Sequence, residues 1–366
     1  MTDHRKPRAP RSTRRKAVLI SAWVLTVAVL LGGATFGYVY FKLNGNLSSV
    51  DVDAKLGTNR PDDADNGSMD ILVLGSDSRS GDNRKLGGGN QESGARSDTA
   101  MVVHLYEDRK KASIVSIPRD TMVSRPACKQ ENGTTAPAAQ RVMFNSAYTT
   151  GGPACSIKTV EQMSGMRIDH FVEVDFSGFK DLIDQLGGVE VTTKKAIHDK
   201  DSHLDLKAGT HRLNGEQSLG LVRTRHGVGD GSDLGRIQLQ HTFIKALLDQ
   251  VKSVGVLSNP TKLYRLADTA TSSITTDNDL ASVSDLTDLA KSVKGISSKD
   301  MQMVTLPVTY DTSDGNRVIP LESQANQVWA ALKADQPIPK SALKGSAGDK
   351  TKDARDAAEA PSDQPR

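Results

Sequence analysis

Arginine and aspartate stand close together at several points of this 366-residue chain. Most of these points follow an apolar, strand-like run or open a helix. An arginine guanidinium binds phosphate through a planar fork of N–H groups, and an aspartate carboxylate binds hard cations. The pairing therefore predicts a site for a polyphosphate and its metal. The five stretches are GSDSR (75–79), RSDT (96–99), IPRD (117–120), RTR (223–225) and DLGR (233–236).

Two of these aspartates are predicted to bind a metal ion. Asp77 comes two residues after the apolar run 69–75, and Asp98 directly precedes the run 99–107. If the two runs are neighbouring strands, both carboxylates meet at one edge of the sheet. Two carboxylates, phosphate oxygens and waters form a common ligand set for Mg²⁺, so we expect Mg²⁺, or else Mn²⁺, at this place. The alternative is that each aspartate only caps a turn.

The arginines are predicted to form the anion site. Arg119 ends the run 112–118, and Arg223 and Arg225 point the same way if their segment is extended. Residues at i, i+3 and i+7 share one face of a helix, as Asp233, Arg236 and Gln240 do here. The alternative is a solvent-exposed face with salt bridges. Arginines about 4 Å apart repel each other by about 4 kcal/mol at an effective dielectric near 20, so a gathered set needs an anion with more than one charge.

Strands alternate with helices along the part of the chain that must position these residues. The runs 69–75, 99–107, 112–118, 170–176 and 301–308 read as strands, and 99–107 and 112–118 read as a hairpin joined by a charged turn. Helical patterns cover 176–186, the segment from Ser232 to about 251, and later stretches at about 261–269, 279–293 and 321–333. This order predicts an α/β fold, with a single α/β/α layered domain around a central mixed sheet.

The segment 17–41 is predicted to be a transmembrane helix. It carries no charge over about 25 residues, which is enough to span a bilayer. Seven lysines and arginines precede it in a basic tail, 1–16, so the N-terminus is expected in the cytoplasm and the rest outside the cell membrane. The alternative is a cleaved signal peptide.

Composition bounds the rest of the chain. The net charge of +3 is close to balance, so no nucleic-acid partner is expected. A polar stalk is expected at 42–67, the folded domain at 68–340, and a disordered tail at 341–366, where apolar residues are few. Outside the cytoplasm, the isolated pair Cys128 and Cys155 is expected to form a disulfide, the alternative being two buried thiols.

The ordered set of motifs resembles the LytR-CpsA-Psr family of cell-wall glycopolymer ligases. The resemblance covers about residues 69–251, and the cysteine pair resembles the actinobacterial branch. One departure is a long glycine-rich insertion between Asp77 and Asp98. The motifs are GSDSR (75–79), ARSDT (95–99), SIPRD (116–120), FNSAYTTGGP (144–153), LNGEQSLGLVRTRH (213–226) and DLGRIQLQ (233–240).

The resemblance implies roles for individual residues. The metal would be held by Asp77 and Asp98, and the pyrophosphate by Arg119, Arg223, Arg225 and Arg236, with Asp233 and Gln240 in the same site. Arg79 and Arg96 are further candidates for substrate binding, and Val174, Phe176, Phe179 and Leu182 are candidates for lining an apolar tunnel that takes the polyprenyl chain, the alternative being ordinary core.

The resemblance also implies a reaction. A glycopolymer would pass from a polyprenyl pyrophosphate carrier to the 6-OH of muramic acid in peptidoglycan, and no nucleotide would be needed. Which glycopolymer is moved stays open. Two alternatives remain: a hydrolase that uses water as the acceptor, and a membrane-anchored, lipid-binding regulator without enzymatic activity.

Overall fold

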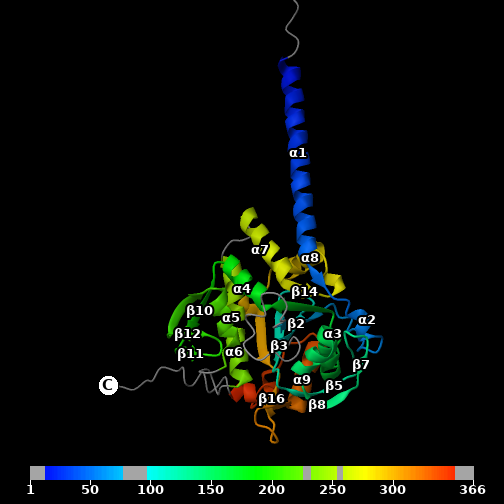
Figure 1. Ribbon diagram of the computed structural model, residues 1–366, viewed down its shortest axis with the longest axis vertical. Helices are drawn as coiled ribbons and strands as arrows, with labels where there is room; N and C mark the ends of the chain where they lie inside the picture. Colours follow the sequence, from blue (N-terminus) through cyan, green and yellow to red (C-terminus); the bar gives the residue numbers. More distant parts are fainter. Residues whose placement is uncertain (1–12, 77–96, 226–231, 254–258, 351–366) are drawn as a thin grey trace, which may run out of the picture. The chain divides into compact units, whose positions relative to one another are not determined.

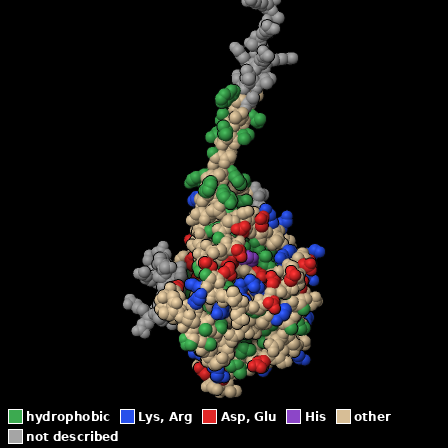
Figure 2. Space-filling model, turned by 90° about the vertical axis from the view of Figure 1, so that its right-hand side faces the viewer, with side chains coloured by type: hydrophobic (Ala, Val, Ile, Leu, Met, Phe, Trp, Pro, Cys, Tyr) green, Lys and Arg blue, Asp and Glu red, His purple; other side chains and the backbone are tan. Residues whose placement is uncertain are grey.

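The computed structural model describes residues 13–76, 97–225, 232–253 and 259–350. The chain divides into two compact units, Met1–Asn46 and Leu47–Arg366. The first contains the single helix α1 (Thr13–Asn46), which includes the whole predicted span 17–41. Within it, Leu25–Asn46 has the length and hydropathy of a membrane-spanning helix, and Figure 2 shows the hydrophobic side chains along it.

The second unit is built around a seven-stranded mixed sheet, which confirms the predicted fold class (Figure 1). The strand order is β1-β14-β9-β2-β3-β4-β15. The predicted hairpin is present as an antiparallel pair, and β2 lies antiparallel to β3 and parallel to β9. The strands are β1 (Ser48–Ser49), β2 (Met69–Ser76), β3 (Ser97–Leu105), β4 (Ala112–Ile117), β9 (His170–Asp175), β14 (Ile274–Thr276) and β15 (Met301–Thr305).

Both faces of the sheet are covered by helices. Successive side chains of a strand point to opposite faces, so each strand contributes to the packing on both sides. Leu72 and Leu74 of β2 lie in the main core, together with buried side chains of α3 (Asn145–Ser164) and α9 (Glu322–Lys333). Ile71 and Val73 point to the opposite face, where α8 (Val283–Val293) packs. These layers form the predicted α/β/α arrangement.

A second hydrophobic cluster holds the helices that carry most of the site residues. Its buried members include Ile183, Leu213, Leu221 and Phe243. They come from α4 (Phe176–Gln185), α5 (Gly215–Arg223), α6 (Asp233–Ser253) and the small β-pairs beside them, β10 (Val189–Thr193) with β13 (Gly209–Leu213) and β11 (Ile197–Asp199) with β12 (Leu204–Leu206). In Figure 1 this group lies on the left of the sheet.

The other described elements lie outside the central sheet. They are α2 (Asp53–Leu56), β5 (Met122–Arg125) paired with β8 (Ala139–Met143), β6 (Cys128–Lys129) paired with β7 (Thr135–Ala136), α7 (Pro260–Ser273), β16 (Val308–Tyr310) paired with β17 (Val318–Pro320), and three short 3-10 helices at Asn278–Leu280, Ser298–Asp300 and Lys340–Ala342.

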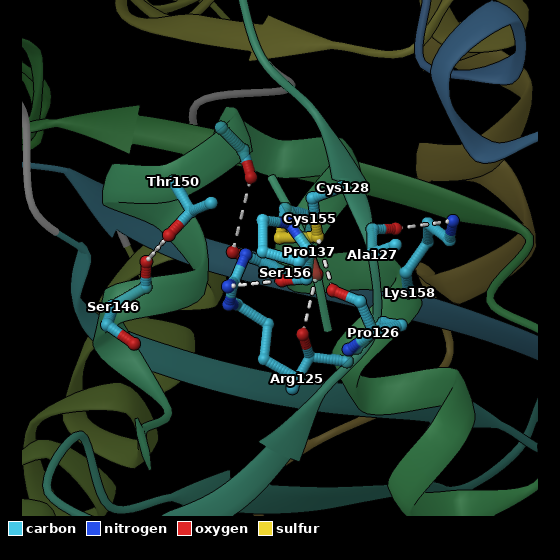
Figure 3. Close-up of a disulfide and its surroundings, with 12 residues drawn as sticks. Arg125, Pro126, Ala127, Cys128, Pro137, Ser146, Thr150, Cys155, Ser156 and Lys158 are labelled. Carbon is cyan, nitrogen blue, oxygen red and sulfur yellow. Dashed lines mark hydrogen bonds between the residues drawn. A yellow bond between two sulfur atoms is a disulfide. The ribbon is translucent and has the colours of Figure 1, made fainter. Parts of the chain in front are cut away.

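The predicted disulfide is present and joins β6 to α3 (Figure 3). Cys128 and Cys155 are each 1% exposed. Gly151 lies against them, since a Cβ there would come within 2.8 Å of the Lys129 carbonyl oxygen and 3.0 Å of the Cys155 Cβ. The glycine therefore allows α3 to approach β6 closely enough for the bond.

The segment predicted as a polar stalk, 42–67, is largely part of the folded unit. Val52 and Leu56 are buried in the main core. Arg60 makes a part-buried ion pair with Glu161 at 2.7 Å and donates to the Ile168 carbonyl at 2.6 Å. The prediction missed these contacts because two apolar residues and one arginine show no periodicity when read alone.

The predicted boundary of the tail, at residue 341, is too early. Ala342, Ser346 and Ala347 are buried, and Ala342 and Ala347 belong to the main core. Small side chains bury little apolar area each, so composition did not reveal that they pack. Residues 351–366 of the predicted tail lie outside the described residues.

Candidate active site

The edge of the sheet where β2 ends and β3 begins carries the first site residue. Ser76 at the end of β2 pairs with Ser97 at the start of β3, so the two strands are neighbours and these two ends lie at one edge of the sheet. Asp98 is the second residue of β3. Asp77, Arg79 and Arg96 lie outside the described residues, and their predicted roles stay predictions.

Asp98 is held by two arginines from distant parts of the chain. Arg119 follows β4 and donates from Nη1 to Asp98 Oδ1 at 2.7 Å. Arg236, on α6, donates from Nη2 to the Asp98 carbonyl oxygen at 3.0 Å. Burial opposes ionisation of the Asp98 carboxyl, but the charges of these two arginines outweigh it and hold its pKa below the usual value. Asp98 is therefore an ionised carboxylate at neutral pH.

Asp233 links the same two arginines at the first turn of α6. It accepts the backbone N–H of Arg119 at 3.1 Å and forms a close ion pair with the Arg236 side chain. Both partners are nearly buried, with side-chain exposures of 9% for Asp233 and 4% for Arg236. The N–H of Leu234 donates to Ser232 Oγ, so Ser232 serves as the predicted cap. These contacts fix the loop after β4 against the N-terminus of α6, whose dipole adds positive potential there.

Arg225 is the arginine whose charge is least well compensated. Burial lowers its pKa, and the positive charges of Arg236 and Arg119 lower it further, more than Asp233 and Asp98 raise it. Its backbone N–H donates to Asp199 Oδ2 at 2.8 Å, which holds the segment after α5 in place. A bound anion would relieve this repulsion, so the electrostatics favour a negatively charged ligand beside Arg225.

Gln240 positions the surrounding backbone. Its amide donates from Nε2 to Thr99 Oγ1 at 3.1 Å and to the Val222 carbonyl at 3.0 Å. Thr99 follows Asp98 on β3, and Val222 lies near the end of α5. The side chain is 5% exposed, so its contacts tie α6 to both neighbours.

Arg223 is held in a different way from the other arginines, by a contact with an aromatic ring. It is the last residue of α5, and its guanidinium stacks over the Phe176 ring at 5.0 Å from the centroid. The expectation of an extended segment with Arg223 and Arg225 on one side is therefore wrong for Arg223, because α5 continues through it and Thr224 follows as its C-cap.

The residues predicted to line a lipid tunnel lie on β9 and α4. Phe176 is buried, and Val174 and Leu182 are half-buried. Phe179 packs on the second hydrophobic cluster, 5.6 Å from the Phe243 ring. They adjoin the core of this unit, and their contact with a lipid stays a prediction.

A cavity of about 610 Å³ opens at the arginines. Arg119, Arg225 and Asp233 line one part of it. The sequence had indicated no ligand-binding role for the remaining walls. They are Pro118, Asp120, Ser232 and Leu234 from nearby segments and Tyr310, Gly315, Asn316, Arg317 and Val318 from the β16–β17 hairpin. Asp120 adjoins Arg119 in the chain and could have been found from that, whereas the hairpin carries no motif.

A divalent cation can be tested against the described residues only in part. Among them, no group of three or more His, Cys, Asp or Glu side chains could hold a metal. Asp98 supplies one ionised carboxylate near the start of β3, whereas Asp77 lies outside the described residues. A hard cation with few protein ligands, completed by phosphate oxygens and water, fits this donor set.

Comparison with known proteins decides the family. The model of the LytR_cpsA_psr family matches residues 39–334. The chain belongs to the LytR-CpsA-Psr family. This confirms the resemblance seen in the motifs.

Several named members are similar to this LytR-CpsA-Psr protein. The cell wall biosynthesis protein LcpA of Corynebacterium glutamicum is 30% identical over 91% of this chain and 69% of its own length. The Bacillus subtilis protein TagT, a polyisoprenyl-teichoic acid–peptidoglycan teichoic acid transferase, is 31% identical over 69% of this chain and 76% of its own. The probable cell wall biosynthesis protein LcpB of C. glutamicum is 35% identical, and the match spans only 47% of LcpB.

The fold agrees with solved structures of the family. The structure of TagT bound to LIIa-WTA is 26% identical, with a TM-score of 0.53, over 76% of this chain and 94% of that one. The family model and the solved structure therefore agree on the family and on the α/β fold.

Proposed function

We propose that this protein transfers a glycopolymer from a polyprenyl pyrophosphate carrier to peptidoglycan. The observation that carries the proposal is the convergence of three arginines. Arg119 and Arg225 line the cavity, and Arg119 and Arg236 both donate hydrogen bonds to Asp98. A pyrophosphate supplies the several negative charges that this set can compensate. TagT and its relative TagV in B. subtilis are both named as transferases of teichoic acid from a polyisoprenyl carrier to peptidoglycan, which supports the same reaction class here.

The proposed step is a phosphoryl transfer. The 6-OH oxygen of a muramic acid residue attacks the phosphorus next to the sugar, and the bond from that phosphorus to the bridging oxygen breaks. Polyprenyl phosphate leaves with the electron pair, and a phosphodiester joins glycan and peptidoglycan. Such reactions depend mainly on positioning and on neutralisation of charge, which the arginines provide.

The acceptor proton needs a base, and Asp98 and Asp233 are two carboxylates of this site. Asp98 is a weak base because its pKa is held below the usual value. Asp233 lines the cavity, so we assign the proton to Asp233.

We further propose that Asp98, together with Asp77, holds Mg²⁺ or Mn²⁺. When bound, the cation would offset negative charge on the phosphate oxygens. Arg119 then has two tasks, since it orients Asp98 through the 2.7 Å hydrogen bond and presents its own charge toward the cavity.

The membrane anchor fits a lipid-linked substrate. With α1 in the membrane and the basic tail in the cytoplasm, the folded unit would face the outside of the cell, where peptidoglycan is assembled. A nucleotide has no part in the proposal, because the energy for transfer resides in the lipid-linked pyrophosphate.

One experiment separates this proposal from its alternatives. The full-length protein in detergent is incubated with lipid-linked glycan, Mg²⁺ and uncrosslinked peptidoglycan. Glycan bound to peptidoglycan supports the transferase. Free phosphorylated glycan would indicate a hydrolase, and binding without turnover would indicate a regulator.

A matched pair of variants tests the role of the arginines. Arg225→Ala should lower transfer by about 100-fold, the usual effect of removing one preorganised group that stabilises transition-state charge. Arg212→Ala is the control, since Arg212 is 54% exposed on β13 and pairs only loosely with Glu190, at 3.8 Å. Equal turnover in the two variants would contradict a pyrophosphate role for Arg225.

A further inference from the structure

The β16–β17 hairpin forms a wall of the cavity that the arginines enter. Tyr310, Asn316 and Arg317 line it, although they lie more than 70 residues beyond Asp233 in the chain. Tyr310 is 38% exposed, so part of its side chain is accessible to a ligand.

The hairpin is attached to the same loop that carries Arg119. The Val318 N–H donates to the Asp120 carbonyl at 3.3 Å, and Thr121 and Val318 form a parallel bridge. Arg317 Nη1 lies 3.5 Å from Asp120 Oδ1, while Arg119 Nε lies 3.5 Å from Asp120 Oδ2. One carboxylate therefore stands between the arginine of the anion site and the arginine of the hairpin.

A second attachment fixes the other strand at the same end of the hairpin, where the Asp311 N–H donates to the Arg317 carbonyl at 2.9 Å. Asp311 accepts Arg141 Nη2 of β8 at 2.7 Å and the Ser313 N–H at 2.9 Å. Asp311 is 5% exposed, so the base of the loop is anchored in the domain. Because each strand of the hairpin has its own attachment, Tyr310 and Arg317 are held in place relative to Arg119.

The side chains of this wall select among the parts of the proposed substrate. A prenyl chain would remove water from the polar groups of Asp120, Asn316 and Arg317 and offer no hydrogen bonds in exchange, which is costly. A saccharide ring is amphipathic, since its C–H face can lie on an aromatic ring while its hydroxyls bond to amide, guanidinium and carboxylate groups. The cavity, about 610 Å³, lies within the range of about 300–1,000 Å³ that is typical of small-molecule sites and exceeds what a phosphate group alone fills.

We propose that Tyr310, Asn316 and Arg317 form a saccharide subsite next to the pyrophosphate arginines. This inference rests on the proposed function for the identity of the ligand, but not for its test. The sugar has two possible sources, the glycan that is transferred and the glycan strand of the acceptor. Both present a pyranose ring beside the phosphorus that reacts, so both share the chemistry that the wall recognises.

Binding measurements test the subsite without any turnover. The full-length protein is titrated by calorimetry with inorganic phosphate, with N-acetylglucosamine 1-phosphate as the donor-side probe, and with an N-acetylglucosamine–N-acetylmuramic acid disaccharide as the acceptor-side probe. Tyr310→Ala and Arg317→Gln remove the proposed contacts. Thr312→Ala is the control, because Thr312 is exposed on the same hairpin and does not line the cavity.

The subsite predicts that Tyr310→Ala weakens binding of one sugar probe by about threefold to tenfold while the affinity for inorganic phosphate is retained. Tyr310→Phe should keep most of the sugar affinity because the ring is retained. Loss with the phosphosugar assigns the subsite to the donor, and loss with the disaccharide assigns it to the acceptor. Unchanged binding of both sugars, or an equal loss of inorganic phosphate, would overturn the proposal.

These outcomes are independent of the transfer assay. A protein that fails to transfer glycan but shows the difference between sugar and phosphate keeps the subsite and loses the transferase. A protein that transfers glycan with unchanged KM values for donor and acceptor in Tyr310→Ala keeps the transferase and loses the subsite.

Discussion

The Cys128–Cys155 disulfide is expected to contribute about 3.6 kcal/mol to the stability of the folded unit. The bond closes a loop with a sequence separation of 27 residues. The chain-entropy relation for a closed loop of about 28 residues gives about 12 cal/mol/K, which is about 3.6 kcal/mol at 25 °C. Cys128→Ala with Cys155→Ala should lower the free energy of unfolding by about this amount, since both side chains are buried and alanine introduces no buried polar group.

The effect should reach the active site through α3. Phe144 donates its N–H to the Thr121 carbonyl at 2.8 Å, and Asn145 donates to the Arg119 carbonyl at 3.2 Å. The disulfide closes the segment from β6 to α3 that includes these two donors. A looser segment should therefore lower transfer activity more than it lowers secondary structure.

Urea and thermal unfolding with and without reductant measure this effect. For a unit of about 300 residues, about 3.6 kcal/mol corresponds to a shift in Tm of about 6 °C. Wild-type protein under reductant should match the double-alanine variant, and the variant itself should not respond to reductant. If the wild-type Tm moved by less than about 1 °C on complete reduction, the loop-entropy argument would be refuted.

Two further predictions concern the core. Burial disfavours the charged form of His104, but hydrogen bonds to Asp70 at 2.9 Å and to Asp335 at 3.0 Å outweigh it and raise the His104 pKa. That contribution to stability is complete below the unfolded-state pKa of about 6.5 and is lost as pH rises through the folded-state pKa. His104→Gln should therefore flatten the dependence of the unfolding free energy on pH above about pH 6.5, measured by urea titrations. An unchanged pH dependence would contradict the pairing of His104 with the two aspartates. Gly151→Ala would place a Cβ 2.8 Å from the Lys129 carbonyl oxygen and should destabilise the protein by about 1–3 kcal/mol, measured by the same titrations, and a neutral result would show that α3 can shift.

Several parts of the fold could be predicted because they depend on local patterns. The runs of β2, β3 and β4 are apolar, and the charged turn between β3 and β4 permits only a hairpin, as found. Helix α6 begins next to Ser232, as its cap and apolar spacing indicate. The disulfide followed from the isolation of two cysteines.

The site could be predicted only as a set of residue types. Arg119, Arg223, Arg225 and Arg236 were expected at one place, and the structure brings Arg119, Arg225 and Arg236 together around Asp98 and Asp233. The sequence did not show that Arg223 is helical and that Arg225 lies beyond the helix, because it does not reveal where α5 ends.

The sequence by itself determined the element types, an apolar helix long enough to span a membrane, and the candidate set of arginines and aspartates, since each depends on residues within a few positions of one another. Only the tertiary structure decided which charges meet. Asp120 and Arg317 face each other at 3.5 Å although nearly 200 residues separate them, and the segment 42–67 joins the core through Val52 and Leu56. Contacts of this kind depend on how the sheet and helices pack, and no local pattern of side chains records them.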